Sequence, residues 1–173
     1  NSLTRTHPSL VTYATKGYGI FTRFSGNSNS LPNGCKLFSF KATQDGVLIG
    51  HYIPCYRKSD NEIGLYDIVG KQFYTNSGSD KFLMGRPLVY DTIQGYQQVD
   101  YIEKQYSASN SSYFDSEIPA SNDLVVEAEL FNEIGTTDGS CAVFGSRIGF
   151  KNKDYTLNFA NLVSNGTKYD SRF

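Results

Sequence analysis

Residues 35–76 read CKLFSFKATQDGVLIGHYIPCYRKSDNEIGLYDIVGKQFYTN. Within this segment, Asp45 and Gly46 separate two runs rich in β-branched and aromatic residues, a pattern that indicates a β-hairpin with a tight turn. A regular ladder about that turn pairs Gln44 with Val47, Ala42 with Ile49, Phe40 with His51, and Phe38 with Ile53. That face is mostly apolar, and the opposite face carries Ser39, Lys41 and Tyr52. His51 is the exception on the apolar face, so it needs a polar partner there or the strand is bulged.

The rest of this segment predicts a second hairpin after a polar loop. Pro54 indicates that the second strand of the first hairpin either lies at a sheet edge or ends there. Residues 59–61 are typical of a loop, and they precede a short strand at 63–68. A turn at 69–71 and a strand at 72–75 complete the pattern.

Outside this segment, the chain continues to read as short strands. Alternating or β-branched runs predict strands at 10–13, 20–24, 81–85, 96–103, 124–131, 142–147, 155–159 and 168–173. In the run at 124–131, the side chains of Val126, Ala128 and Leu130 fall on one face. No run of ~10 residues has helical periodicity. The sequence therefore predicts an all-β protein.

Composition and charge exclude several partner classes. The chain of 173 residues is long enough for one domain with a core, and its 14% aromatic content favours pleated sheets. The formal net charge of −1, with acids and bases mixed along the chain, provides no basic field for nucleic acid and no polybasic anchor for anionic lipid. No apolar run approaches the ~20 residues of a membrane span. We therefore expect neither nucleic acid nor membrane as a partner.

The three cysteines predict free thiols. Cys35 and Cys55 fall on opposite faces of a regular hairpin, which disfavours a disulfide between them, and Cys141 is distant in sequence. There is no close cysteine pair, and His7 and His51 are the two histidines, so the spacing does not match a zinc site. We expect partly buried, unpaired thiols.

Four pieces of the segment carry a family resemblance: Phe38–Lys41, Tyr52–Asp60, Ile63–Asp67 and Phe73–Gly78. Together they resemble the closing segment of concanavalin A-like (LamG-type) jelly-roll domains. Such domains are common in tail proteins of phages that infect gut bacteria and in surface proteins of those bacteria. The resemblance implies an antiparallel jelly-roll β-sandwich.

The order of the matching pieces implies an unusual domain organisation. Residues 96–103 resemble the opening strand of the same domain type, and residues 142–147 resemble its LFGxR strand. Residues 1–86 then correspond to a closing half, 87–95 to a connector, and 96–173 to an opening half. Three explanations remain open: a fragment of a tandem array, a window from a larger chain, or a permuted single sandwich. In each case we expect the halves to pack on each other or on neighbouring chains, because a half-sandwich exposes an apolar face.

Catalytic and metal motifs are weak in this sequence. Glycoside hydrolases that resemble this fold carry an E-x-D-x-x-E motif, and the nearest candidates are Glu127, Glu129 and Glu133, with no aspartate between them. We interpret these glutamates as a solvated outer face and expect no enzyme. Acidic residues at 60–62 and 115–117 could hold calcium, but loop Asp and Asn residues more often form turns, so no cofactor or resident metal is predicted.

Sugar recognition is the function that the residues allow best. Tyrosine rings stack on pyranose faces, and arginine reads hydroxyl groups by hydrogen bonds. The candidate binding residues are Tyr18, Arg23, Tyr113, Arg147 and Tyr155. The alternative for each tyrosine is a half-buried position in the sandwich with a wet hydroxyl. The loop at 57–60 is either a binding loop or is held by a local pair, Arg57–Asp67 or Lys58–Asp60.

The resemblance implies a non-catalytic carbohydrate-binding, receptor-binding or structural module. The expected setting is a phage virion, as a tail fibre, spike or decoration, or a bacterial cell surface, so the chain is expected in a virion or outside the cell. Expected partners are a glycan or host receptor and other copies or virion proteins. The alternatives are an accessory binding domain of a secreted carbohydrate-active enzyme, and a purely architectural assembly module.

Overall fold

The structure is a computed structural model, and it describes residues 2–6, 19–22, 24–25, 34–89, 93–105, 111–118, 124–133, 139–147, 155–164 and 168–172. These residues form fifteen strands and contain no helix, so none of them could form a membrane-spanning helix. The strands are β1 Ser2–Thr6, β2 Gly19–Ile20, β3 Phe24–Ser25, β4 Gly34–Gln44, β5 Val47–Arg57, β6 Ile63–Asp67, β7 Gln72–Thr75, β8 Leu83–Met84, β9 Tyr96–Gln98, β10 Ile102–Lys104, β11 Phe114–Asp115, β12 Leu124–Glu133, β13 Gly139–Arg147, β14 Tyr155–Ser164 and β15 Lys168–Arg172.

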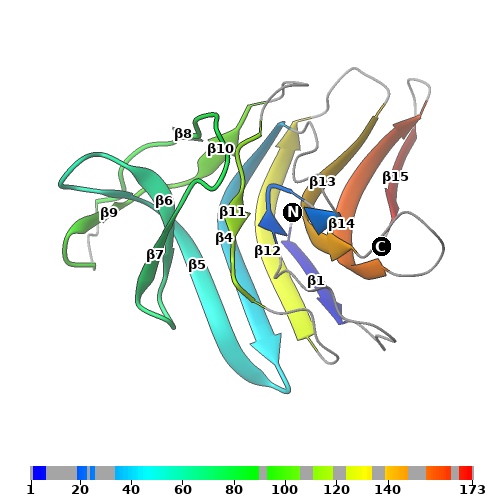
Figure 1. Cartoon of the computed structure of the whole chain (residues 1–173), viewed down its shortest axis with the longest axis horizontal. Helices are drawn as coiled ribbons and strands as arrows, with labels where there is room; N and C mark the ends of the chain where they lie inside the picture. Colours follow the sequence, from blue (N-terminus) through cyan, green and yellow to red (C-terminus); the bar gives the residue numbers. More distant parts are fainter. Residues whose placement is uncertain are drawn as a thin grey trace.

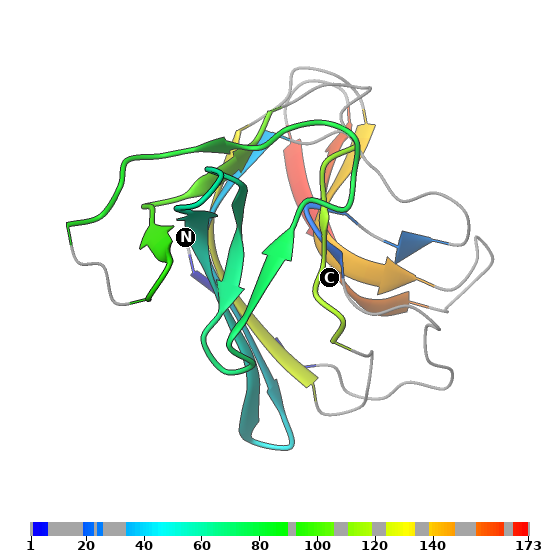
Figure 2. The same cartoon turned by 60° about the vertical axis from the view of Figure 1, so that its left-hand side comes forward.

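The strands pair into two sheets (Figures 1 and 2). Across the described residues, sheet A has nine strands with the main order β1-β12-β4-β5-β6-β7, and β8, β9 and β10 attach beside β4 and β5. Sheet B has six strands in the order β11-β2-β13-β14-β15, with β3 paired in parallel to β13. All other strand pairs are antiparallel. The expected all-β sandwich is confirmed, whereas the strand order of a jelly roll stays a prediction.

The main core lies between sheet A and the short strands β2 and β11. It is formed by Ile20, Phe21, Cys35, Leu37, Phe40, Ala42, Tyr52, Leu65, Phe82, Ile102, Phe114, Ile118, Leu124, Val126, Ala128 and Leu130. The rings of Phe82 and Phe114 stack with centroids 4.5 Å apart, and Phe21 packs 5.1 Å from Phe82. The alternation predicted for β12 is confirmed, because Val126, Ala128 and Leu130 all belong to this core.

The turn at Asp45 and Gly46 is confirmed, but the register beyond it is not the regular one. Thr43 pairs with Leu48, whereas Ala42 pairs with Gly50, so Ile49 is an extra residue in a β-bulge. Beyond the bulge, Phe40 pairs with Tyr52 and Lys41 with His51, in place of the expected Phe40–His51 and Phe38–Ile53 pairs. The bulge moves Tyr52 onto the core face and His51 to the opposite face, beside Lys41. A regular ladder would place His51 on the apolar face without a polar partner, and the bulge avoids this.

Gly50 is needed at this bulge because the ring of Tyr52 lies against it. A Cβ on Gly50 would stand 2.7 Å from Cε2 of that ring. The ring is held from its other end, since its hydroxyl donates to the Ser116 carbonyl at 2.9 Å. Tyr52 also packs edge to face on Phe40, with centroids 5.8 Å apart. The bulge and the core therefore fix each other.

Pro54 does not end its strand, contrary to one sequence expectation. β5 continues to Arg57, and Pro54 pairs with Leu65 of β6. The Pro54 carbonyl accepts a hydrogen bond from the Val99 amide at 3.0 Å. In an extended strand, the N–H and C=O of one residue point to the same side, so the missing N–H faces β9 rather than β6. The ladder with β6 therefore loses no bond.

Residues 96–104 lie between parts of β4 and β5 in sheet A, and this placement divides one of the expected strands in two. β4 and β5 pair near their turn and then separate; β9 pairs with β5 and β10 pairs with β4. The strand expected at 96–103 is therefore two strands rather than one. The expected strand at 20–24 is also divided, because Phe21 has a φ of +63° and directs its ring into the core. The expected strand at 10–13 lies outside the described residues.

Strands from both parts of the sequence share each sheet. β12 lies between β1 and β4 in sheet A, and β13 pairs with β2 in sheet B. Lys104, at the end of β10, is fully buried and donates to the Phe21 carbonyl at 3.1 Å. Cys35 and Cys55 are both buried and are not joined by a disulfide, which confirms the expectation for these two. The Cys141 side chain lies outside the described residues.

Candidate functional site

Four side chains on the outer face of sheet A form a continuous group, here called the aromatic platform: Arg57, Tyr66, Phe73 and Tyr96. Tyr66 of β6 pairs with Phe73 of β7, and Arg57 of β5 pairs with Tyr96 of β9, and paired residues project to one face. The Tyr96 ring is central, with its centroid 5.0 Å from Tyr66 and 4.8 Å from Phe73. The Arg57 guanidinium lies 5.5 Å from the Phe73 centroid. All four side chains are half-buried.

Two buried side chains lie next to the platform on the same face of sheet A. Ile53 pairs with Tyr66, and Cys55 pairs with Gly64, so both point to the platform side of the sheet. Both side chains are buried, yet neither is part of the main core. The aromatic rings therefore have packed side chains beside them on the same face, and their remaining exposed surface faces solvent.

The Phe73 ring packs directly against the backbone of Gly64. A Cβ at this position would stand 2.3 Å from the Tyr74 carbonyl oxygen and 2.4 Å from Cζ of the Phe73 ring, closer than real Cβ atoms approach. The ring thus lies directly over the strand because residue 64 has no side chain. Any other residue would displace Phe73 and with it the contact to Tyr96.

A bidentate ion pair fixes Arg57 beside the rings. Its Nε donates to Oδ1 and Oδ2 of Asp60 at 3.0 and 3.2 Å, and its Nη2 donates to Oδ2 at 2.7 Å. The hydrogen bonds from Arg57 hold the pKa of the Asp60 carboxyl below its usual value, and the same bonds raise the pKa of Arg57. Asp60 also accepts from the Glu62 amide at 3.2 Å, which closes the loop after β5. The expected Arg57–Asp67 pair is wrong, because Arg57 pairs with Asp60.

Asp67 instead holds the turn between β6 and β7. Asp67 is 3% exposed, and its carboxylate accepts from three backbone amides: His51 at 2.8 Å, Val69 at 3.0 Å and Gly70 at 2.9 Å. These bonds tie the turn that follows Tyr66 to strand β5. Phe73 lies three residues after Gly70, so its position depends on that turn.

Of the five binding residues expected from the sequence, Tyr113 is the one whose side chain is described, and it is not part of this platform. Tyr113 is half-buried just before β11, where its amide donates to Asn76 Oδ1 at 3.1 Å and its carbonyl accepts from Ser77 at 2.8 Å. Tyr18 and Arg23 lie outside the described residues. Arg147 and Tyr155 are paired at the ends of β13 and β14, and their side chains lie outside the described part of the chain.

The platform was missed at the sequence level, although part of it had a signal. The second hairpin, with its turn at 68–71, is confirmed, and that hairpin alone places Tyr66 opposite Phe73. Nothing local in the sequence connects Arg57 with Tyr96, because their pairing depends on the segment inserted between β4 and β5.

The acidic groups considered for catalysis and calcium have other roles where they are described. Glu127 and Glu129 are exposed on β12, which agrees with a solvated outer face, and the Glu133 side chain lies outside the described residues. Asp115 accepts from the Glu117 amide at 3.0 Å, which is the geometry of a turn. Across the described residues, no group of three or more His, Cys, Asp or Glu side chains could hold a metal ion.

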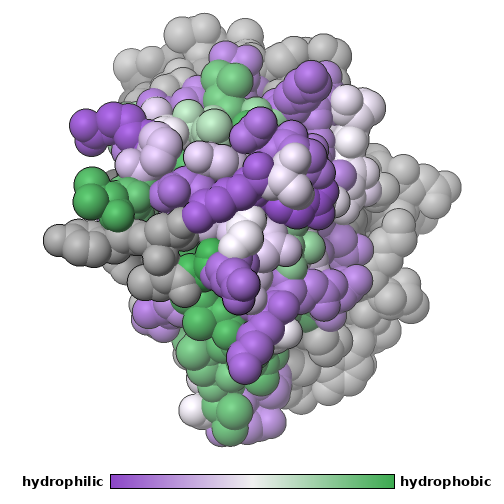
Figure 3. All heavy atoms as spheres, turned by 90° about the vertical axis from the view of Figure 1, so that its left-hand side faces the viewer, coloured by the Kyte–Doolittle hydropathy of each residue, from purple (hydrophilic) through white to green (hydrophobic). Residues whose placement is uncertain are grey.

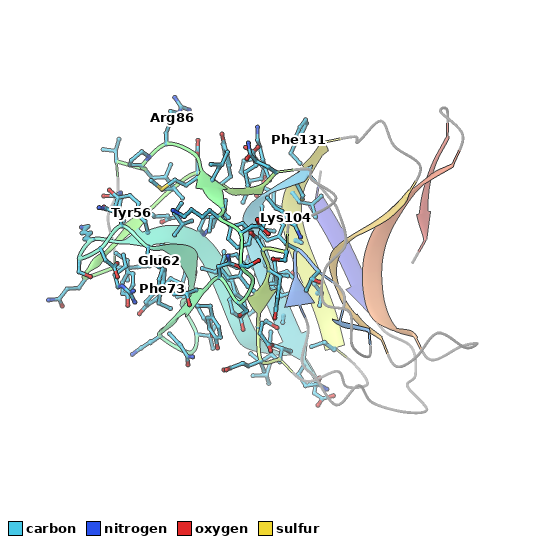
Figure 4. All side chains as sticks on the ribbon, turned by 45° about the horizontal axis from the view of Figure 1, so that its top comes forward. Tyr56, Glu62, Phe73, Arg86, Lys104 and Phe131 are labelled. Atoms are coloured by element: carbon cyan, nitrogen blue, oxygen red, sulfur yellow. The ribbon has the colours of Figure 1, made fainter. Side chains whose placement is uncertain are left out.

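A second aromatic group lies elsewhere on sheet A. The Lys36 ammonium stands 3.6 Å from Glu103 Oε2, and its distances to the ring centroids of Tyr101 and Phe131 are 5.0 and 5.9 Å. Phe131 is 56% exposed, and Figure 4 shows it well away from Phe73. In this group, the Lys36 ammonium is balanced by the Glu103 carboxylate at close range, and Phe131 is the single well-exposed ring. It therefore provides a control position for the platform.

A scan of protein-family models, a search of curated proteins and a search of solved structures each found no match. The chemistry of the site is therefore argued from the platform's own geometry.

Proposed function

We propose that this chain is a non-catalytic recognition module that binds glycans or a surface receptor through the aromatic platform. One observation carries the proposal: three half-exposed rings are fixed side by side, and a guanidinium held by a carboxylate lies against one of them. Aromatic faces stack on the C–H faces of pyranose rings, and a fixed arginine supplies directional donors to hydroxyl groups. Both elements are already in place without a ligand, which reduces the entropy cost of binding.

The proposed setting is a phage virion, as a tail fibre, spike or decoration, or a bacterial cell surface. Its support is the resemblance of residues 38–41, 52–60, 63–67 and 73–78 to LamG-type domains, and a jelly-roll strand order is part of the same proposal.

Glycan-array binding of the intact chain tests this proposal. The wild type is compared with Phe73→Ala, which removes a ring of the platform, and with Phe131→Ala, which removes an exposed ring elsewhere on sheet A. We expect the wild type to bind at least one glycan class. Phe73→Ala should lose about tenfold in affinity, since one stacking contact on an aromatic side chain is worth ~1–3 kcal/mol. Phe131→Ala should lose no affinity. Absence of binding to all arrayed glycans and to host-cell surfaces would contradict the proposal.

A second candidate function is assembly with other copies or virion proteins. Two neighbouring turns at one end of sheet A expose aliphatic side chains, namely Val47, Leu48, Ile68 and Val69, with exposed fractions of 41–64%. The second of these turns lies against β5, since the Ile68 amide donates to the His51 carbonyl at 2.8 Å. Figure 3 shows a hydrophobic group at the lower end of the molecule, where the β4–β5 hairpin ends. Exposed apolar patches of this kind favour contact with another macromolecule.

A further inference from the structure

The hydrogen bonds of the Arg57–Asp60 pair decide which of its atoms can reach a ligand. The Asp60 carboxylate accepts four bonds, three from Arg57 and one from the Glu62 amide. A carboxylate offers about four acceptor positions, so these bonds fill its capacity. Arg57 uses Nε and one N–H of Nη2, and its Nη1 makes no hydrogen bond to any of the described residues. The donors that remain for a ligand therefore belong to Arg57.

The charge of the pair decides what kind of ligand suits those donors. The positive charge of Arg57 is compensated at contact distance by Asp60. Glu62 adds a second carboxylate whose charge also acts on Arg57. A carboxylated or sulfated glycan that approaches Arg57 would therefore meet a compensated guanidinium with acidic neighbours. Hydroxyl oxygens can accept from Nη1 without introducing a further negative charge.

We propose that the aromatic platform selects neutral glycans, that Arg57 donates to their hydroxyl groups, and that Asp60 is a positioning residue that also excludes anionic sugars. This inference rests on the proposed function and specifies its ligand class. The three rings supply stacking contacts that do not depend on charge. The carboxylate of Asp60 supplies selectivity in two ways, since it orients the guanidinium and cancels its charge.

Isothermal titration with matched sugars tests the inference. The probes are linear hexasaccharides of glucose, mannose and galactose, together with the same oligomers carrying C6 carboxylates. These are combined with any neutral and acidic glycans that bind on the array. The proteins are the wild type, Arg57→Gln, Asp60→Asn and Asp115→Asn. Asp115→Asn is the matched control, because it makes the same chemical change at an exposed turn outside the platform.

We expect the wild type to bind a neutral probe at least about tenfold more tightly than its carboxylated form, the size of one charge-assisted contact. Arg57→Gln should lose about tenfold in affinity for the neutral probe. Asp60→Asn should weaken neutral binding and shift the preference toward the carboxylated probe, with binding that falls as salt is added. A residue with only a structural role would weaken both probes equally and leave their ratio unchanged. Asp115→Asn should match the wild type.

Two results would overturn the inference, and they are distinguishable. Wild-type binding that favours carboxylated or sulfated glycans through Arg57 would contradict neutral selection while leaving a glycan-binding function in place. An Asp60→Asn variant that folds and keeps the wild-type ratio of neutral to carboxylated binding would contradict the role of Asp60. Failure of the wild type to bind any probe, on the array or in solution, would contradict the proposed function itself.

Discussion

Replacing Asp67 should destabilise the protein by an amount that depends on how many amide donors lose their acceptor. In Asp67→Ala, the amides of His51, Val69 and Gly70 all lose the carboxylate to which they donate. In Asp67→Asn, an amide nitrogen in place of Oδ2 faces the Gly70 N–H, while the oxygen at Oδ1 keeps its bonds to His51 and Val69. The alanine variant therefore loses three bonds and the asparagine variant loses one.

The magnitude follows from where the three donors lie. Val69 and Gly70 are exposed in the turn, so water replaces their lost partner at a cost of ~0.5 kcal/mol each. The His51 amide lies within β5 and is shielded, so its loss costs about 2 kcal/mol, as for a hydrogen bond to a charged group. Asp67→Ala should thus cost ~3 kcal/mol and Asp67→Asn ~0.5 kcal/mol. For a chain of this length, these costs correspond to shifts in Tm of roughly 6–12 °C and 1–2 °C.

Urea unfolding followed by far-UV circular dichroism measures both costs, with the slope m compared between variants. Glu127→Gln, at an exposed position of β12, serves as the control and should stay within ~0.5 kcal/mol of the wild type. Equal destabilisation by alanine and asparagine would refute the account of the three bonds. A cost below ~1 kcal/mol for Asp67→Ala would also refute it, because the buried carboxylate would then contribute little beyond its replacement by water.

Three further outcomes are expected. Gly64→Ala places a methyl group 2.3 Å from the Tyr74 carbonyl oxygen and 2.4 Å from Phe73 Cζ, so it should displace β7 together with that ring. It should reduce array binding as strongly as Phe73→Ala, and unchanged binding would show that the ring position is irrelevant. The pKa of Asp60 is lowered mainly by its hydrogen bonds to Arg57, so the pair should persist as pH falls through the unfolded-state pKa and break only near the folded one. Carbon-detected NMR should therefore show a higher titration midpoint for Asp60 in Arg57→Gln, and equal midpoints would contradict the pairing. Val47→Lys should lower any concentration-dependent association seen by sedimentation velocity, and association that persists unchanged would exclude the turn patch.

Local chemistry predicted the hairpins and one face of the core. The turn at 45–46 follows from Asp-Gly between β-rich runs, and the buried face of β12 follows from its alternation. The bulge at Ile49 did not follow, because a regular ladder and a bulged one share the same turn and differ only in which side chain the core accepts. The prediction that β5 lies at a sheet edge or ends at Pro54 is wrong for a related reason. Whether its missing N–H matters depends on β9, which is distant in sequence.

The candidate site likewise has one part that local sequence predicts and another that depends on strands distant in sequence. The pairing of Tyr66 with Phe73 belongs to one hairpin, so the sequence contained enough information to place them together. Tyr96 reaches them only because residues 96–104 fill the gap between two separating strands. Tyrosine composition alone favoured residues such as Tyr113, whose backbone is tied to the loop after β7. A platform that spans four strands requires the tertiary structure.

Saturation-transfer difference NMR tests the central claim most directly. Aromatic protons of the intact chain are irradiated in the presence of a neutral glycan that binds on the array. The account predicts transfer to C–H protons on one face of a sugar ring in the wild type and in Phe131→Ala, and loss of that transfer in Phe73→Ala. Transfer that persists in Phe73→Ala, or that reaches no ring C–H proton in the wild type, would contradict recognition by the aromatic platform.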